Sequence, residues 1–366
     1  MTPVPKQCSL PTSPAEDSLK TLLANMSTRH PLGRIRVLLI VGLLVIAPFG
    51  LALAQAVSVP LESHERNVGV MGTTLQIRVF APDESLAIQA VDAAEAELRR
   101  VEDLMTDWRP SPLSSLNAAA GEGPVVVPRE LAAIVARSQE VGRLTLGAFD
   151  ITYAGVGRLW NFKTKPPIVP DAVAIQEALA TVGAARIRVN AETNTVTLPD
   201  HMTVGLGGIA KGYGVDRAMQ VLLDLGIQHA IVNAGGDLKA LGREGGKPWE
   251  IAVKHPRDPE RVIAVIGLSN AAMVTSGDYE RFFEHEGQRF HHILDPRTGY
   301  PSNGAMSATV IAPSAEFADA LATALCVLGA EEGFKIIESM KRIEAIVIDM
   351  AGDPHATSGL KASLRE

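Results

Sequence analysis

Residues 205–242, "GLGGIAKGYGVDRAMQVLLDLGIQHAIVNAGGDLKALG", decide between two ways of connecting helices and strands in this chain. A glycine-rich loop leads into a helical segment, and residues 229–242 then read as a strand that breaks at a Gly-Gly-Asp turn. Such a block departs from the strict βα alternation of a parallel Rossmann sheet. The stretch therefore favours an α+β fold.

In the rest of the chain, helices and strands are also expected in blocks and not in strict alternation. Asp83 is the expected N-cap of a long helix, whose apolar residues recur at helical spacing at Ile88, Val91, Leu98, Val101 and Leu104. Further helices are expected at 129–144, 314–329 and 331–341, and strands at 68–80, in a hairpin at 186–198, at three or four places up to 294, and at 344–350. Residues 109–124, rich in Ser, Pro, Asn and Gly, are expected to form a loop. We predict mixed or antiparallel sheets flanked by helices.

The first 54 residues have the pattern of a secretory signal peptide. Arg34 and Arg36 precede an unbroken apolar run, and the run ends in the small-residue spacing Ala52-x-Ala54. The alternative is an uncleaved membrane anchor, because the 18 residues 37–54 are just long enough to span a bilayer. Residues 55–366 are expected to form a single domain, or two sub-domains with the site between them.

Charge and cysteine content exclude several classes of function. Residues 1–54 hold five Lys/Arg and two Asp/Glu, so their removal would change the formal net charge from −7 to −10. A chain of this charge is a poor candidate for binding nucleic acid or anionic lipid. Only Cys8 and Cys326 occur, and Cys8 falls in the segment expected to be removed, so the mature chain has no intramolecular disulfide available.

The glycine loop is the first candidate for chemistry. Its glycines, with Lys211 among them, are Gly205, Gly207, Gly208, Gly212 and Gly214. Glycines allow close approach of a phosphate to the backbone, and the start of a helix offers free N–H groups. The spacing matches neither a dinucleotide fingerprint nor a P-loop. Phosphate binding and tight packing both remain open for this loop.

Asp319 and Thr323 form the second candidate. They lie four residues apart in a helical segment, so their side chains share one face. A carboxylate and a hydroxyl are hard oxygen ligands that magnesium accepts, with phosphates and water completing the shell. The alternative is a surface acid beside a threonine that hydrogen-bonds to its own helix.

The third candidate is "FHHILDPRTGYP", residues 290–301. Strand alternation sends the rings of His291 and His292 to opposite faces, so a two-histidine metal site is not expected. A single histidine beside an Asp-Pro turn suits a general base near neutral pH, or a partner for the turn itself.

Taken together, seven short motifs resemble those of the ApbE-type FAD:protein FMN transferases across residues 66–362. The motifs are "MGTTLQIRV", "GAFDIT", "GGIAKGYGVD", "VNAGGD", "TSGDYERFF", "HHILDPRTGYP" and "ADALATAL". The resemblance implies an ApbE-like, T-fold-related architecture and an exported, periplasmic enzyme. Such an enzyme splits FAD with Mg²⁺, attaches FMN through its phosphate to a Thr or Ser hydroxyl of a partner protein, and releases AMP. The partner would be a membrane-associated electron-transfer subunit.

The resemblance also implies roles for individual residues. His292 corresponds to the general base, and Asp319, Thr323 and the backbone carbonyl of Gly208 correspond to the magnesium ligands. Residues that hold FAD correspond to Met71, Trp108, Ala148, Phe149, Asp150, Lys211 and Ile293.

One position departs from the family pattern. The family usually has an aspartate where this chain has Gly205, so a carboxylate that would bind part of the nucleotide is missing. Asp150 and Asp237 are the residues that we expect to be able to replace it. Flavin binding without turnover therefore stays open as an alternative to transfer. Hydrolysis of FAD to FMN and AMP, which the resemblance also implies for some relatives, is a second alternative.

Overall fold

The computed structural model describes residues 61–363, which belong to one compact unit. The predicted signal peptide and its alternative, a membrane anchor, lie outside the described residues. Within 61–363, no helix has the length and apolar character needed to span a membrane.

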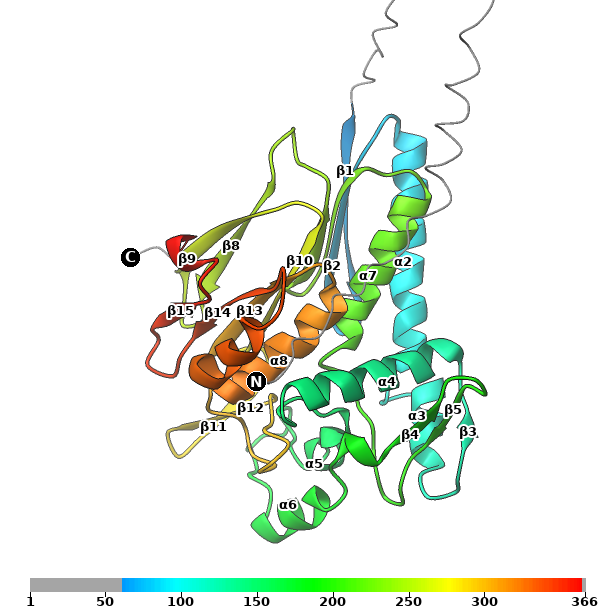
Figure 1. Cartoon of the computed structure of the whole chain (residues 1–366), viewed down its shortest axis with the longest axis vertical. Helices are drawn as coiled ribbons and strands as arrows, with labels where there is room; N and C mark the ends of the chain where they lie inside the picture. The colour runs from blue at the N-terminus through cyan, green and yellow to red at the C-terminus, as the bar shows by residue number, and fades with distance from the viewer. Residues whose placement is uncertain (1–60, 364–366) are drawn as a thin grey trace, which may run out of the picture. The chain divides into compact units, whose positions relative to one another are not determined.

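An eight-stranded antiparallel sheet forms the centre of the fold, in the order β1-β2-β6-β7-β10-β13-β14-β15 (Figure 1). Its strands are β1 (Glu62–Val70), β2 (Thr73–Ala81), β6 (His229–Ala234), β7 (Asp237–Leu241), β10 (Ala271–Gly277), β13 (Ser307–Ala312), β14 (Glu344–Ile348) and β15 (Pro354–Ala356). The β6–β7 hairpin turns at Gly235 and Gly236, both with positive φ, as the Gly-Gly-Asp motif predicted.

The prediction of one strand over 68–80 is wrong. The segment belongs to a hairpin, in which β1 and β2 pair with Val70 opposite Thr73. The two residues between the strands, Met71 and Gly72, have φ values of 53° and 72°. Two successive positive φ values give the tight turn whose twist matches a hairpin, and "MG" is not one of the residue pairs that usually announce it.

Four long helices accompany the sheet. They are α2 (Glu84–Met105), α4 (Arg129–Leu144), α7 (Ala210–Asp224) and α8 (Ala315–Ile337). Asp83 caps α2 as predicted, since its side chain accepts a hydrogen bond from the Leu86 N–H at 2.9 Å. The two predicted C-terminal helices form one element, α8, which breaks at Gly329, where φ is 72° and ψ is −175°.

The sheet buries both of its faces. Along β6, Val232 faces the helices α2, α7 and α8, whereas Ile231 faces the other side. The second face is covered by a hairpin of β8 (Trp249–His255) and β9 (Asp258–Leu268), which Figure 1 shows on the side opposite the helices. In the helix-side core, Cys326 is a buried free thiol. Ile88, predicted to belong to the apolar face of α2, is exposed.

The remaining elements lie around the lower ends of α2 and α8 in Figure 1. They are α3 (Pro112–Ala118), β3 (Val125–Val126), η1 (Ile151–Tyr153), α5 (Ala154–Gly157), α6 (Ala172–Leu179), η2 (Ala184–Arg186), β4 (Arg188–Asn190), β5 (Thr195–Thr197), β11 (Phe282–His285) and β12 (Gln288–His291). The short η3 (Lys361–Ser363) instead lies against β9. The loop predicted at 109–124 therefore contains a helix, α3, which Ser111 and Ser114 start with a reciprocal capping box. Five strands, rather than three or four, lie between residues 242 and 294.

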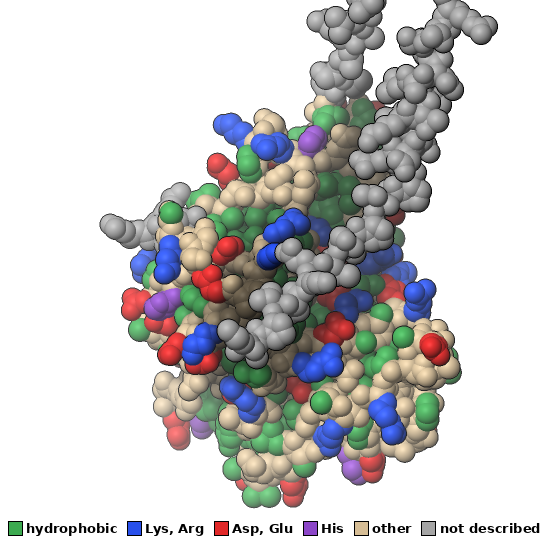
Figure 2. Space-filling view, viewed as in Figure 1, with side chains coloured by type: hydrophobic (Ala, Val, Ile, Leu, Met, Phe, Trp, Pro, Cys, Tyr) green, Lys and Arg blue, Asp and Glu red, His purple; other side chains and the backbone are tan. Residues whose placement is uncertain are grey.

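Apart from the cores on the two faces of the sheet, a separate apolar cluster packs against the "HHILDPRTGYP" turn. Its buried members are Val156, Trp160, Ile175, Phe283, Phe290 and Leu294. The ring of Trp160 stacks on Phe290 with centroids 5.7 Å apart, and its Nε1–H donates to the Gly299 carbonyl at 2.9 Å. On the face shown in Figure 2, basic and acidic side chains are interspersed rather than gathered in one patch of a single sign.

Candidate active site

A cavity of ≈ 410 Å³ opens where the end of α2, the glycine loop, α8, β10 and the turn after β12 meet. Every residue to which the family resemblance assigns a role contributes to its wall, whereas Asp237 does not line it. These residues are Met71, Trp108, Ala148, Phe149, Asp150, Gly208, Lys211, His292, Ile293, Asp319 and Thr323. Segments more than 200 residues apart in the chain thus line one hollow.

The glycines of the loop fall into two groups, those that line the cavity and those that pack inside α7. Gly205, Gly207 and Gly208 line the cavity. Gly212 and Gly214, inside α7, are packing glycines: a Cβ on Gly212 would lie 2.2 Å from the Ala315 carbonyl oxygen. Tight packing is thus confirmed for Gly212, which faces α8, and for Gly214, whose Cβ would lie 2.8 Å from Leu98 in α2. Phosphate binding at the glycines that line the cavity stays a prediction.

Asp319 lies on the cavity side of α8 and is only 2% exposed. Its Oδ2 accepts a hydrogen bond from the Gly212 N–H at 3.1 Å. Burial, and then the negative charge of Asp237, raise the pKa of the Asp319 carboxyl well above its ordinary value. Lys211 donates from Nζ to Asp237 Oδ1 at 2.6 Å and offsets part of this charge. Although burial lowers it, the two carboxylates raise the pKa of Lys211.

Thr323 and Gly208 complete the predicted magnesium set. A Cβ placed on Gly208 would lie 3.1 Å from Thr323 Oγ1, so the loop backbone and the hydroxyl are neighbours. Thr323 Oγ1 is also 3.5 Å from the hydroxyl of Ser276. Within residues 61–363, no three His, Cys, Asp or Glu side chains form a ready-made metal site. One carboxylate, one hydroxyl and one carbonyl are three oxygen ligands, and water or the phosphate oxygens of a ligand would have to complete an octahedral Mg²⁺ shell.

The two histidines of the third candidate have separate surroundings. His291 is buried, and its Nε2 lies 2.8 Å from the Ser302 carbonyl oxygen, so this ring braces the turn. His292 lines the cavity, and its buried Nδ1 has no hydrogen-bond partner within the described chain. Burial, and then the positive charge of Arg281, lower the pKa of His292 to about 4. The ring is therefore neutral at pH 7.

The residues predicted to hold FAD differ in their exposure to solvent and in whether their side chains already make hydrogen bonds within the chain. Trp108 is 68% exposed and presents its ring at the cavity wall, whereas Phe149 is buried. The Asp150 carboxylate is already engaged, because it caps η1 by accepting from the Thr152 N–H at 2.7 Å and also accepts from the Ala184 N–H at 2.8 Å. Asp150 thus shapes the cavity wall, and its carboxylate does not take the place of the missing one.

Several polar residues of the cavity were not predicted to belong to it. They are Glu102, Asp107, Tyr153, Thr275, Ser276, Glu280 and Arg281. Asp107 directly precedes Trp108, and Arg281 belongs to the quoted motif "TSGDYERFF", so their position beside recognised residues was the available signal. Within residues 61–363, no ion pair involves the Arg281 side chain.

Comparison with known proteins gives consistent matches. The model of the ApbE family matches residues 71–347. The FAD:protein FMN transferase of Haemophilus influenzae is 34% identical over 307 residues, covering 79% of this chain and 88% of that protein. The FAD:protein FMN transferase of Treponema pallidum is 32% identical over 324 residues, covering 83% and 90%.

Solved structures agree with these matches. The crystal structure of the ApbE protein from Thermotoga maritima superposes with a TM-score of 0.76 at 33% identity, covering 83% of this chain and all of that chain. The flavin transferase ApbE of Vibrio cholerae gives a TM-score of 0.73 at 31% identity, with the same coverage. The α+β class and the ApbE-like architecture predicted from the sequence are confirmed. The chain belongs to the ApbE family.

Proposed function

We propose that this chain transfers the FMN half of FAD to a Thr or Ser hydroxyl of a partner protein, with Mg²⁺ bound and AMP released. The observation that carries the proposal is the convergence of Asp319, Thr323, Gly208 and His292 in one cavity. The names of the relatives, FAD:protein FMN transferase, support the same reaction.

The residues present fit a divalent cation. Asp319 is a buried carboxylate whose ionised form is disfavoured by burial and by Asp237, so a nearby cation would stabilise it. The Thr323 hydroxyl, which neighbours the Gly208 backbone, and the Gly208 carbonyl would supply the other protein oxygens. When bound, Mg²⁺ would neutralise the pyrophosphate charge and improve AMP as a leaving group.

His292 is suited to take the proton of the attacking hydroxyl. Its imidazole is neutral, and a neutral ring has a nitrogen free to accept a proton. Its backbone N–H donates to the Arg281 carbonyl at 3.0 Å, which fixes the strand end that carries the ring. Binding of an anionic pyrophosphate would offset the Arg281 charge and raise the pKa of His292 toward the working pH.

The remaining wall would position FAD. Arg281 and Lys211 supply positive charge for the phosphates, and the Trp108 ring offers a flat face for a flavin or a base. The AMP formed by cleavage and the FMN phosphoester on the partner then account for all atoms of FAD and of the hydroxyl.

The place and the partner of the reaction belong to the same proposal. The Arg34–Ala54 pattern supports export through a signal peptide, and hence a periplasmic enzyme. A hydroxyl acceptor on a membrane-associated electron-transfer subunit would then meet the enzyme outside the cytoplasm.

Coexpression with a candidate acceptor tests the proposal. We expect mass spectrometry to find the FMN mass on one Thr or Ser of the acceptor, and chromatography to find AMP in equal amount. Rapid AMP release from FAD and Mg²⁺ without any acceptor would instead identify a hydrolase. Tight FAD binding without AMP under either condition would identify a flavin-binding protein, and both results would overturn the proposed transfer.

A further inference from the structure

The space beside Gly205 is occupied by a carboxylate from another part of the chain. A Cβ placed on Gly205 would lie 3.5 Å from Asp107 Oδ2 and 2.9 Å from the Ala154 Cβ. Asp107 follows α2 by two residues, nearly one hundred positions before Gly205. The oxygen of residue 107 thus lies where a side chain of residue 205 would extend.

Asp107 is free to bind a ligand. Its side chain is half-buried and lines the cavity, and no hydrogen bond or ion pair within residues 61–363 engages its carboxylate. The two acids considered as replacements are both committed elsewhere, Asp150 to the cap of η1 and Asp237 to Lys211. Asp107 is therefore the available carboxylate at this end of the glycine loop.

A tyrosine lies beside the Asp107 carboxylate in the cavity wall. A Cβ on Gly207 would lie 3.1 Å from the Tyr153 hydroxyl, so this phenol lies along the same loop. Burial, and then the charge of Asp107, raise the pKa of Tyr153 to about 12. The phenol therefore stays uncharged at pH 7 and adds no second negative charge beside the carboxylate.

We propose that Asp107 supplies, from the loop after α2, the carboxylate that binds FAD at the position left open by Gly205. This inference rests on the proposed function. Its carboxylate accepts hydrogen bonds from neutral O–H or N–H groups of the nucleotide, since the phosphates would be repelled by its charge. The residue positions the substrate and takes no part in bond making.

Flavin fluorescence on titration with FAD tests the inference in its simplest form. We expect Asp107→Ala to weaken FAD binding about 10- to 100-fold, because a hydrogen bond to a charged group is lost. Asp107→Asn keeps one hydrogen-bond acceptor, so its FAD affinity should lie between those of the unchanged chain and of Asp107→Ala. Asp92→Asn, which changes an exposed carboxylate on α2 outside the cavity, is the control and should bind FAD as the unchanged chain does. Titration with FMN and with AMP shows which half of FAD is held.

Moving the carboxylate gives a sharper test. Gly205 does not have a positive φ, so an aspartate is compatible with its backbone, and Ala154→Gly removes the one close contact. We expect Gly205→Asp with Ala154→Gly to restore FAD binding when Asp107 is Ala, and to weaken it when Asp107 is present, because two carboxylates then share one space. A merely structural role for Asp107 does not predict this reversal of sign.

The outcomes separate this inference from the proposed function. If the unchanged chain transfers FMN and Asp107→Ala binds FAD within twofold of it, Asp107 is not the missing carboxylate. If binding is lost and the residue 205 variant does not restore it, the inference is also overturned. If the unchanged chain binds FAD in an Asp107-dependent way yet transfers no FMN, the inference stands and the proposed function fails.

Discussion

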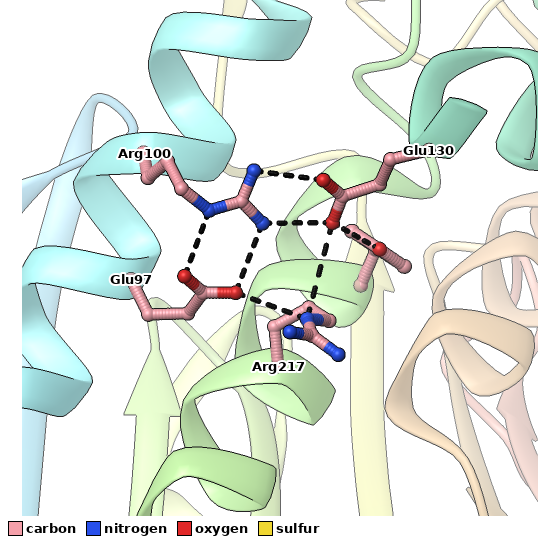
Figure 3. A network of polar contacts seen from close by, with 5 residues as sticks. Glu97, Arg100, Glu130 and Arg217 are labelled. Carbon is pink, nitrogen blue, oxygen red and sulfur yellow. Dashed lines mark hydrogen bonds and ion pairs between the residues drawn. The ribbon is translucent and has the colours of Figure 1, made fainter. Parts of the chain in front are cut away.

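Two charged clusters of this molecule differ in burial and in balance. The cavity cluster consists of Lys211, Asp237 and Asp319, and the bridging cluster consists of Glu97, Arg100, Glu130 and Arg217. In the bridging cluster, two arginines face two glutamates across α2, α4 and α7 (Figure 3). In the cavity cluster, one lysine faces two acids.

The bridging cluster satisfies its charges completely. Arg100 donates to Glu97 at 2.8 Å and to Glu130 at 2.7 Å, and these hydrogen bonds hold the pKa of both carboxyls below the ordinary value. The arginine side chains are 44% and 42% exposed, so water screens the pairs. A balanced and exposed network of this kind connects three helices and contributes little else.

The cavity cluster leaves its charges incompletely satisfied. Asp319 is almost fully buried, and Oδ2 of Asp237 has no hydrogen-bond partner within the described residues. Buried charge without full compensation costs free energy and is retained where a ligand completes it. The comparison teaches that the number of ion pairs does not indicate function, whereas the charge left unpaired in a buried place does.

Replacing Asp319 by Asn should give the largest effect. We expect FMN transfer to fall on the order of 10⁴-fold, because several kcal/mol of charge stabilisation by the cation are lost. Chelation of divalent ions should slow the unchanged chain to the same level. AMP release from FAD measures both, and full activity of the variant would refute the metal assignment.

The stability of the same variant should move in the opposite direction. Because burial and Asp237 raise the pKa of Asp319, its ionised form destabilises the folded state at neutral pH. Asn removes that charge and still accepts from the Gly212 N–H. Without metal, the melting temperature of the variant should equal or exceed that of the unchanged chain. Addition of Mg²⁺ and FAD should raise the melting temperature of the unchanged chain but not that of Asp319→Asn.

Replacing His292 by Asn should have the second largest effect. We expect transfer to slow about 10²- to 10⁴-fold, the usual contribution of a general base. FAD affinity should stay within about twofold, since the proton of the acceptor hydroxyl, and not the flavin, is the partner of this ring. Single-turnover transfer and flavin fluorescence measure the two quantities separately. A loss of FAD affinity instead would show that the ring binds the nucleotide.

His292 should also make stability depend on pH. Its pKa is about 4 in the folded chain and 6.5 ordinarily, so between these values the unfolded chain binds the extra proton. The contribution of the neutral His292 ring to the free energy of unfolding is fully present above pH 6.5 and is lost as the pH falls toward 4. From pH 7 to 5, urea unfolding should show the unchanged chain losing about 2 kcal/mol more than His292→Asn. The exposed control His201→Asn should behave as the unchanged chain.

Local patterns predicted the elements that depend on neighbours in sequence. The bounds of α4, Arg129–Leu144, are those predicted, and Asp83 caps α2, because helical periodicity and capping act within a few residues. The β1–β2 turn was missed because the positive φ of Met71 is imposed by sheet pairing. The capping box of Ser111 and Ser114 has Ser where the usual signature has Glu or Gln, so the sequence announces the start of α3 only weakly.

The candidate site was predictable in its residue types but not in all of its contacts. Asp319, Thr323 and His292 lie in motifs that can be recognised in a linear sequence. The placement of Asp107 beside Gly205 depends on how the end of α2 packs against the glycine loop, which no local pattern encodes. For the same reason, the engagement of Asp150 in a helix cap was not expected.

Replacing Glu130 by Gln in the bridging cluster should give the smallest effect. We expect the free energy of unfolding to fall by about 1 kcal/mol or less, because partly exposed ion pairs are screened and Gln keeps an acceptor for the Tyr213 hydroxyl. The difference should shrink further at high salt, and FMN transfer should not change. Urea unfolding at two salt concentrations and the AMP assay measure these effects. A transfer defect as large as that of Asp319→Asn would mean that the two clusters are coupled, and that balance and exposure do not separate structural charge from functional charge in this fold.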